Sequence, residues 1–280
     1  MNHGKTIELF FVDGTADGLV TAELSNWNGK AIKIQRNDIC DCERQDIKEP
    51  GVYFLFCKGE GIKDDVYIGE AENIKDRLMQ HIKDHQSEKE KYYWHTAVIF
   101  TGKDLNKASI RYLENRLVEL TKIANRYNVL TKSTYKNTVL KESQIASLEE
   151  FLDNTKILIS ALGYKILEPI VKKEDDKPKD VLHINSPLKA YAIVNDEGFV
   201  LLKGSEVAVD KIAPAVEKKL TSMREKYLSS GLIKDGVTTD DIVFPSPSAA
   251  AVFVLGYSAS GPKYWVNNGG KTLKEIESIE

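Results

Sequence analysis

The chain has 280 residues, of which 42% are hydrophobic and 29% are charged, and its formal net charge is −3. This composition is typical of a globular protein and excludes a disordered or fibrous one. The length suggests two domains of ordinary size. No apolar run approaches the roughly 20 residues that a membrane-spanning helix needs, so no membrane partner is expected. The small negative charge also argues against a uniformly basic nucleic-acid-binding protein.

The three cysteines, Cys40, Cys42 and Cys57, are too few and too uneven in number for a disulfide framework. Such sparse use fits a reducing compartment, and the N-terminus lacks the basic start and cleavage site of a secretory signal. A cytoplasmic location is therefore expected. A zinc site at Cys40 and Cys42 would need two more ligands nearby, and the spacing does not match known zinc fingers.

The charge is unevenly distributed along the chain. Residues 1–69 carry 8 basic and 12 acidic side chains, whereas residues 70–137 carry 13 basic and 9 acidic side chains, a net charge of +4. A local basic face of this kind can bind a polyanion even when the whole molecule is acidic. A solvated lysine-rich surface is the alternative that the charge alone leaves open.

The first residues predict an N-terminal β extension, residues 1–49. Apolar residues alternate at its start, and Asn28-Gly29 between two alternating segments is typical of a hairpin, so residues 6–36 are read as a small β element. The charged stretch 36–49 predicts a short helix.

Strand and helix patterns then alternate. Apolar residues every four positions at Ile74, Leu78 and Ile82 indicate one of the helices. The patterns predict strands at 51–57, 66–69 and 92–101 and helices at 71–83, 106–124 and 143–162, the last capped by Ser143.

A second domain is expected after a linker. Residues 171–179 are charged, poor in apolar side chains and contain a proline, which is typical of a linker. Beyond them the sequence predicts a hairpin around 195–198, helices at 212–228, 249–255 and 272–279, and a strand at 263–267. The fold class is α+β, with domains at 50–168 and 186–280 joined by residues 169–185.

Two strand tripeptides carry the first candidate site residues. Gly51-Val52-Tyr53 and Tyr67-Ile68-Gly69 lie on strands that are expected to pair, and side chains on one face of paired strands can lie about 5 Å apart. Two phenols brought together in this way could share a proton network with a water molecule. Strands favour tyrosine in any case, so ordinary packing is the alternative.

Three further polar residues stand close to apolar helix faces. Arg77 and His81 are four residues apart and share one helix face, where a guanidinium can bind phosphate or the residues can simply be exposed. Glu114 lies between core positions, where a lone carboxylate is costly unless it is paired or binds a metal. A salt bridge to Arg111 or Arg116 is its alternative.

The order and spacing of these residues, from the GVY and YIG tripeptides to the arginine and the later glutamate, resemble the GIY-YIG nuclease family over about residues 50–135. The resemblance implies a small central antiparallel or mixed sheet flanked by helices. It also implies a metal-dependent endonuclease that hydrolyses DNA, with Mg²⁺ or Mn²⁺ as the cofactor and DNA as the partner. A weak or inactive nucleic-acid-binding module with the same fold is the alternative function.

The resemblance also implies a catalytic role for each residue. Tyr53 would take the proton from the attacking water, and Tyr67 would orient that water and the phosphate. Arg77 would stabilise the transition-state charge, and Glu114 would hold the metal ion in a single-metal mechanism. His81 matches a histidine that helps to activate the nucleophile or to bind phosphate in restriction-type members.

Two positions depart from the family pattern. Glu70 follows the YIG tripeptide where a lysine is common, and its negative charge would weaken phosphate binding unless it points away. The family asparagine near the end of the glutamate helix is matched weakly by Asn128, with Asn125 as the competing choice. Asn73 and Lys75 are further weak candidates for substrate binding.

Several further segments resemble a bacterial subgroup of these nucleases that has an added C-terminal domain of unknown function: 9–36, 110–114, 161–164, 198–205, 244–250 and 256–265. Such a domain would serve target recognition or oligomerisation, with Lys203, Lys263 and Trp265 as candidate contacts that could equally be structural. Because a single active site cuts one strand, double-strand cutting would need a homodimer or two encounters.

Overall fold

The computed structural model describes residues 3–132, 134, 138–171, 181–208, 213–214 and 217–278. The chain divides into two compact units, Met1–Pro169 and Ile170–Glu280. The linker predicted at 171–179 lies, except for Val171, outside the described residues. None of the helices in the described part of the chain is long and apolar enough to span a membrane.

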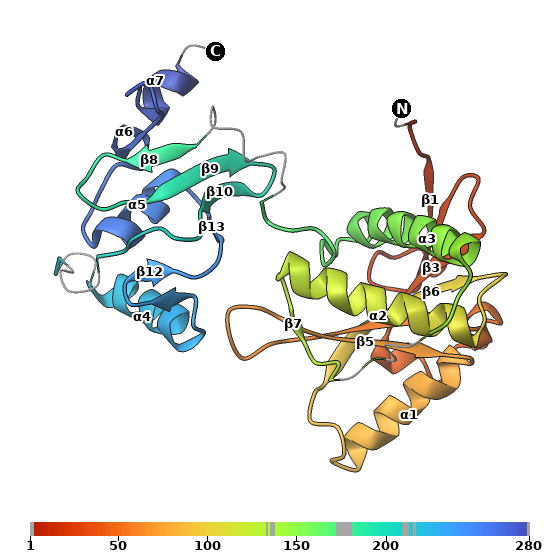
Figure 1. The fold of residues 1–280 in the computed structure, drawn as a ribbon. Coiled ribbons are helices and arrows are strands. Elements are labelled where there is room, and N and C mark those ends of the chain that lie inside the picture. The colour runs from red at the N-terminus through yellow and green to blue at the C-terminus, as the bar shows by residue number, and fades with distance from the viewer. Residues whose placement is uncertain are drawn as a thin grey trace. The chain divides into compact units, whose positions relative to one another are not determined.

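The N-terminal unit is built on one seven-stranded sheet with the order β1-β2-β3-β6-β4-β5-β7 (Figure 1). Neighbouring strands are antiparallel except β5 and β7, which are parallel. The predicted N-terminal β element joins this sheet directly, because β3 pairs with β6 along seven residues. The strands are β1 (Ile7–Phe11), β2 (Val20–Leu24), β3 (Gly29–Gln35), β4 (Gly51–Cys57), β5 (Asp65–Ala71), β6 (Trp94–Gly102) and β7 (Asn128–Val129).

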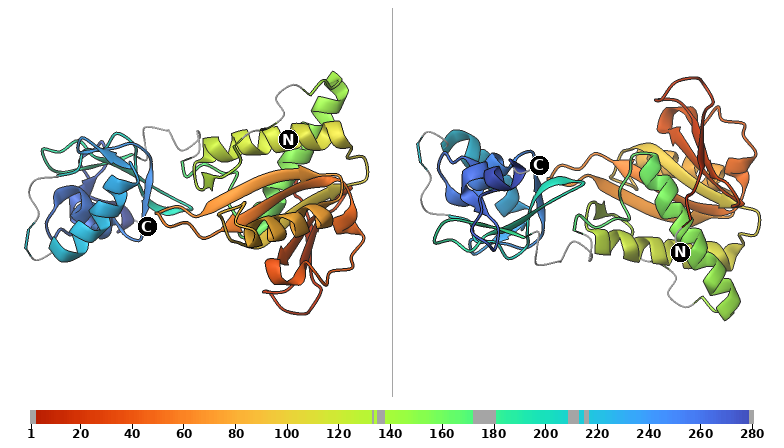
Figure 2. Two further views of the ribbon diagram at one scale, coloured as in Figure 1. Left: turned by 90° about the horizontal axis from the view of Figure 1, so that it is seen from below. Right: turned by 90° about the horizontal axis from the view of Figure 1, so that it is seen from above.

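Helices cover both faces of this sheet, as the two views of Figure 2 show. Strand β4 is buried throughout, and alternate side chains belong to two separate cores. Val52, Phe54 and Phe56 pack with α2 and α3 on one face of the sheet. Tyr53 and Leu55 pack with α1 on the other face. Because successive strand residues point to opposite faces, the tyrosine of the first tripeptide is directed towards α1. The helices are α1 (Ile74–Gln86), α2 (Lys107–Ala124) and α3 (Glu142–Ala161).

Two details of the sequence prediction are wrong in this unit. The stretch 36–49 forms two short 3₁₀ turns, η1 (Arg36–Asp38) and η2 (Asp46–Lys48), rather than one helix. Its isolated buried residues give no continuous apolar stripe, and neither turn has a side-chain cap. Helix α3 is capped at Lys141, not Ser143, and the Lys141 N–H donates to the Gln144 side chain at 3.0 Å.

The C-terminal unit contains a five-stranded sheet, β13-β10-β9-β8-β14, and a separate β11-β12 pair. The predicted hairpin is confirmed, with Asn195 opposite Gly198, whose φ of 109° suits glycine. In the helix predicted at 212–228, residues 213–214 are not helical, residues 212, 215 and 216 are not described, and α4 is described from Glu217. The strands are β8 (Leu182–Ile184), β9 (Tyr191–Asn195), β10 (Gly198–Leu201), β11 (Ile233–Lys234), β12 (Val237–Thr238), β13 (Ile242–Phe244) and β14 (Trp265–Val266). The helices are α4 (Glu217–Ser229), α5 (Pro247–Leu255), α6 (Gly261–Tyr264) and α7 (Leu273–Glu277).

Helix α5 forms the centre of the C-terminal core. Ser246 caps it by accepting from the Ala249 N–H at 3.1 Å, and Gly256 ends it with a φ of 80°. Trp265 is fully buried beside it and donates its indole N–H to the Pro247 carbonyl at 3.0 Å. Trp265 is therefore a core residue and not an exposed contact. The whole architecture is α+β, as the sequence predicts.

Candidate functional site

The two tyrosines of the tripeptides lie on the same face of the β4–β5 pair. Tyr53 is opposite Gly69, and Leu55 is opposite Tyr67, so the phenols are diagonal neighbours with ring centroids 6.3 Å apart. A Cβ atom on Gly69 would come within 2.4 Å of the Tyr53 hydroxyl oxygen. The glycine of the second tripeptide is thus needed because the Tyr53 side chain lies across its backbone.

Helix α1 presents Arg77 to these phenols. Its N-cap is Asn73, whose side chain accepts from the Asp76 N–H at 3.2 Å, and Arg77 follows one turn later. Burial disfavours the charge of Arg77, but interactions with Tyr53 and Tyr67 outweigh burial and hold the pKa of the guanidinium above its ordinary value. Burial in turn raises the pKa of both phenols. The arrangement is therefore a fixed cation between two neutral hydroxyls.

Glu114 comes from α2 and is almost buried, with 6% of its surface exposed. It makes no hydrogen bond or ion pair with any described residue, and the two arginines predicted as its partners pair with other carboxylates. Arg116 bonds Glu149 at 2.8 Å, and Arg111 lies 3.8 Å from Glu70. Burial and the nearby Glu70 raise the pKa of Glu114 to about 7. Such a carboxylate binds a proton or a cation more readily than one in water.

Glu70, the departure from the family pattern, also lies at this site. Its carboxylate does not point away, but it accepts from the Lys107 ammonium at 2.9 Å. Arg111 approaches its other oxygen at 3.8 Å. The negative charge is therefore compensated locally by two cations, which reduces the repulsion that it would exert on a phosphate.

These side chains surround one pocket with a volume of about 680 Å³. Among the described residues, β7 pairs with β5 at Asp65 and Val66, before the part of β5 that lines the pocket. Thr131 closes the next position, where its hydroxyl donates to the Ile68 carbonyl at 2.7 Å and accepts from the Ile68 N–H. The lining residues are Tyr53, Tyr67, Glu70, Ala71, Glu72, Asn73, Asp76, Arg77, Gln80, Lys107, Glu114 and Thr134.

Three of the candidate residues are not in this lining. His81 is fully buried behind Tyr53, with its Nε2 atom 2.9 Å from the phenol oxygen. Lys75 bonds Glu43 at 3.1 Å. Asn128 is at the other end of β5, where its amide donates to Asp65 at 2.9 Å, because the end of α2 leads the chain to that end of the strand. The competing Asn125 adopts the left-handed conformation that ends α2.

Glu90 and Lys107 belong to the surroundings of the site but were not among the predicted site residues. Glu90 contacts His81 Nδ1 through both carboxylate oxygens, at 2.8 and 2.9 Å. No spacing rule links residues nine positions apart across a turn, so nothing in the pattern indicates this contact. Lys107 is at the first position of α2, one turn before Arg111. Its basic charge is the only feature of the sequence that could have indicated a place at the site.

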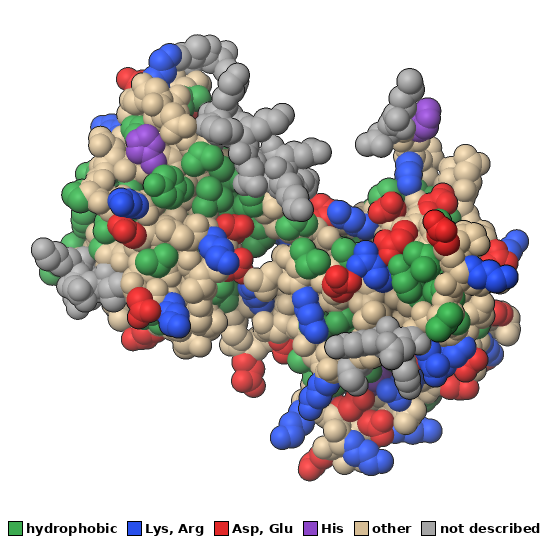
Figure 3. All heavy atoms as spheres, viewed as in Figure 1, with side chains coloured by type: hydrophobic (Ala, Val, Ile, Leu, Met, Phe, Trp, Pro, Cys, Tyr) green, Lys and Arg blue, Asp and Glu red, His purple; other side chains and the backbone are tan. Residues whose placement is uncertain are grey.

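The basic excess of residues 70–137 does not form a uniform surface. Several of its cations are paired with carboxylates, as in Lys75 with Glu43 and Lys107 with Glu70. On the face of the molecule drawn in Figure 3, acidic and basic side chains of the N-terminal unit are interspersed. The pocket is thus distinguished by single buried charges and not by a broad basic patch.

Comparison with known protein families assigns both parts of the chain. Residues 49–128 match the GIY-YIG catalytic domain, and residues 181–277 match a domain of unknown function, DUF4357. The chain therefore carries a GIY-YIG domain, a nuclease-type domain, followed by a DUF4357 domain, as the sequence resemblance predicts. No curated protein and no solved structure matched the chain.

Proposed function

We propose that the N-terminal unit is an endonuclease that hydrolyses DNA phosphodiester bonds with the help of one divalent cation. The observation that carries this proposal is the convergence of Tyr53, Tyr67, Arg77 and Glu114 on one pocket, from two strands and two helices. The match of residues 49–128 to the GIY-YIG catalytic domain supports it independently, and DNA is the substrate on which nucleases of this family act.

Glu114 is the residue that would hold the cation. It is a nearly buried carboxylate without a hydrogen-bond or ion-pair partner among the described residues, and it lines the pocket. Mg²⁺ and Mn²⁺ prefer oxygen ligands, and Mg²⁺ keeps several waters when one carboxylate binds it. No group of three or more His, Cys, Asp or Glu side chains placed to hold a metal ion occurs in the described residues, so a cation here would be held mainly by one carboxylate, water and substrate. When bound, the cation supplies positive charge at the phosphate and the leaving oxygen.

The other side chains divide the remaining work of hydrolysis. The Arg77 guanidinium, held between the phenols, binds a phosphate oxygen and stabilises the charge that develops in the transition state. Tyr67 is less buried than Tyr53 and orients the scissile phosphate and the water. Tyr53 accepts the proton of the attacking water and is backed by His81 at 2.9 Å.

A plasmid assay tests this function. The full chain is incubated with supercoiled DNA and Mg²⁺ or Mn²⁺, beside Glu114→Ala and Arg77→Ala. Glu119→Ala is the matched control, because Glu119 lies on the same helix with its side chain 55% exposed. Nicking that needs the cation, disappears in both site variants and persists in the control is the expected result.

Other outcomes contradict the proposal. DNA binding that weakens with salt, without any cutting, would favour the inactive binding module. If the chain neither cuts nor binds DNA, DNA is excluded as its substrate. Linear product formed without a nicked intermediate would be consistent with the proposal and would indicate two sites acting together, and light scattering would then show a homodimer.

We further propose that the C-terminal unit serves target recognition or oligomerisation of the nuclease. Lys203 and Lys263 remain its candidate contacts, whereas Trp265 does not, because it is buried. Weaker binding to DNA in a Lys203→Ala, Lys263→Ala variant would support recognition. Unchanged binding together with a concentration-dependent mass would support oligomerisation.

A further inference from the structure

A chain of three side chains begins at Tyr53, which lines the pocket described above (the tyrosine pocket), and continues through two residues outside its lining. His81 Nε2 is 2.9 Å from the Tyr53 hydroxyl oxygen, and His81 Nδ1 is 2.8 and 2.9 Å from the two oxygens of Glu90. Tyr53 and His81 have no exposed surface, and the Glu90 side chain is 18% exposed. The reactive phenol is thus connected to a carboxylate through one buried imidazole.

The turn after α1 builds this contact. Glu88 adopts a φ of 59°, which reverses the chain, and the N–H groups of Lys89 and Glu90 both donate to the Asp84 carbonyl. The Glu90 carbonyl lies 3.2 Å from His85 Nδ1. The backbone around Glu90 is therefore tied to the last turns of the helix that carries His81, and its side chain is held against the imidazole.

The hydrogen-bonding capacities of the three groups define the position of the imidazole proton. An ionised carboxylate only accepts, so Nδ1 must donate to Glu90. A neutral imidazole has one N–H, so its Nε2 is then an acceptor. The Tyr53 hydroxyl is 2.9 Å from Nε2 and must donate to it. The lone pairs of the Tyr53 oxygen are left for a donor in the pocket.

We propose that Glu90 is a positioning residue, which holds His81 in the tautomer with its proton on Nδ1 and so directs the Tyr53 hydroxyl proton onto Nε2. The inference rests on the proposed nuclease function and adds a residue to its machinery. As the attacking water forms its bond to phosphorus, it gives a proton to the Tyr53 oxygen, and Tyr53 passes its own proton to Nε2. The bond to the leaving oxygen breaks, and solvent protonates that oxygen. The buried imidazolium beside Glu90 later returns its Nε2 proton to Tyr53, which releases a proton to water in the pocket.

Two further observations agree with this direction of the chain. Burial lowers the pKa of His81 despite the opposing effect of Glu90, which favours the neutral imidazole in the resting enzyme. Tyr92 is the other polar neighbour of Nδ1, but its oxygen is farther away, at 3.3 Å, than either oxygen of Glu90. Glu90 is therefore the main hydrogen-bond partner of Nδ1.

Nitrogen-15 spectra of the full chain, without substrate or metal, test the proposal directly. The five histidines are assigned with single variants, and the shifts of His81 report which nitrogen carries the proton. We expect Nδ1–H in the wild type and a mixture of tautomers in Glu90→Gln, because an amide can accept or donate. Glu88→Gln is the matched control, with the same chemical change on an exposed side chain of the same turn, and should keep the wild-type spectrum.

The cleavage assay adds a second readout. We expect Glu90→Gln to lower kcat by about 10- to 100-fold with little change in KM, since supporting groups of this kind act on the chemical step. In a His81→Ala background the same substitution should change kcat by less than about twofold, because Glu90 acts through His81.

The two readouts separate failure of this inference from failure of the proposed function. A proton on Nε2 in the wild type, or an unchanged tautomer in Glu90→Gln, would overturn the role of Glu90 whether or not DNA is cut. An additive loss of kcat in the double variant would show a merely structural effect and overturn it as well. If DNA is never cut, the nuclease function fails, and the spectra still decide how His81 is held.

Discussion

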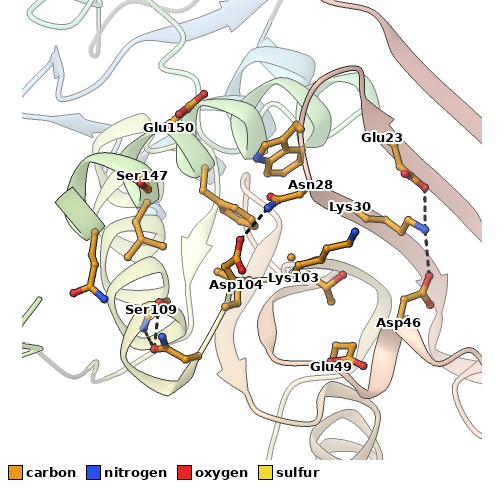
Figure 4. A pocket seen from close by; sticks show the side chains of 18 of the residues that line it. Glu23, Asn28, Lys30, Asp46, Glu49, Lys103, Asp104, Ser109, Ser147 and Glu150 are labelled. Atoms are coloured by element: carbon orange, nitrogen blue, oxygen red, sulfur yellow. Dashed lines mark hydrogen bonds and ion pairs between the residues drawn. The ribbon is translucent and has the colours of Figure 1, made fainter. Parts of the chain in front are cut away.

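Two hollows of the N-terminal unit differ in how their charged side chains are paired, and not only in volume. The larger hollow has a volume of about 1420 Å³ and lies between the β2–β3 turn, the β6–α2 loop and α3 (Figure 4). Trp27 is one of the residues that line it, and we call it the Trp27 groove. The smaller is the tyrosine pocket, about 680 Å³. In the groove, Lys30 pairs with Glu23 at 2.9 Å and with Asp46 at 3.6 Å. The charges of these three side chains thus compensate one another.

The tyrosine pocket has the opposite character. Glu114 has no bonding partner there among the described residues, and burial together with Glu70 raises its pKa to about 7. Buried titratable groups with shifted pKa values are typical of active sites, because chemistry needs groups that are not already neutralised. A buried carboxylate without a bonding partner, rather than the size of a hollow, therefore distinguishes the pocket that we propose as the active site.

The largest effect is expected at the cation between the phenols. Arg77→Ala should lower DNA cleavage by about a thousandfold, since it removes transition-state charge stabilisation. Arg77→Lys should still lose about a hundredfold, because an ammonium lacks the planar fork of the guanidinium. Single-turnover cleavage rates measure both. Equal activity of the lysine variant and the wild type would show that only the charge matters.

The next effect comes from the glycine beneath Tyr53. In Gly69→Ala the new methyl group would meet the Tyr53 hydroxyl, so Tyr53 must move from its place over β5. We expect cleavage to fall about 10- to 100-fold and the free energy of unfolding to fall by about 1–3 kcal/mol, as overpacking does. Gly61→Ala is the control, because its Cβ would meet open space. Denaturant unfolding and the cleavage assay should separate the two variants.

The carboxylate of Glu114 should oppose folding when it is ionised. Its pKa is about 7 in the folded chain against an ordinary 4.5, so the folded state binds the proton more tightly and stability falls as pH rises from about 4.5 to 7. In the absence of divalent cations, Glu114→Gln should therefore be more stable than the wild type by about 1–3 kcal/mol at pH 8. Below pH 4 the difference should vanish. Denaturant unfolding at both pH values measures this, and equal stability at pH 8 would show that Glu114 is compensated after all.

The smallest effect is expected in the Trp27 groove. Lys30→Ala removes partly exposed ion pairs and should change the free energy of unfolding by less than about 1 kcal/mol. Cleavage should stay within about twofold of the wild type. A loss of tenfold or more would break the comparison, because the groove would then contribute to DNA binding.

Some features of this protein followed from its sequence alone. The GVY and YIG tripeptides and the apolar spacing of α1 predicted the strands and the helix that carry the site, because periodicity reports local burial directly. The Asn195–Gly198 turn could also be predicted, because glycine adopts the positive φ of Gly198 more readily than other residues do. The same local patterns placed Tyr53, Tyr67, Arg77 and Glu114 on strands and helices that meet at one pocket.

Other features were decided only by the tertiary structure. Glu90 reaches His81 through a turn that a left-handed Glu88 makes, and the pairing of Glu70 with Lys107 depends on the packing of α2 against β5. Asn128 lies away from the pocket because of where α2 ends. A sequence pattern shows which face of an element is buried, but it does not specify which polar groups of different elements meet. That depends on the geometry of turns and packing, and these contacts set the charge and proton positions at the site.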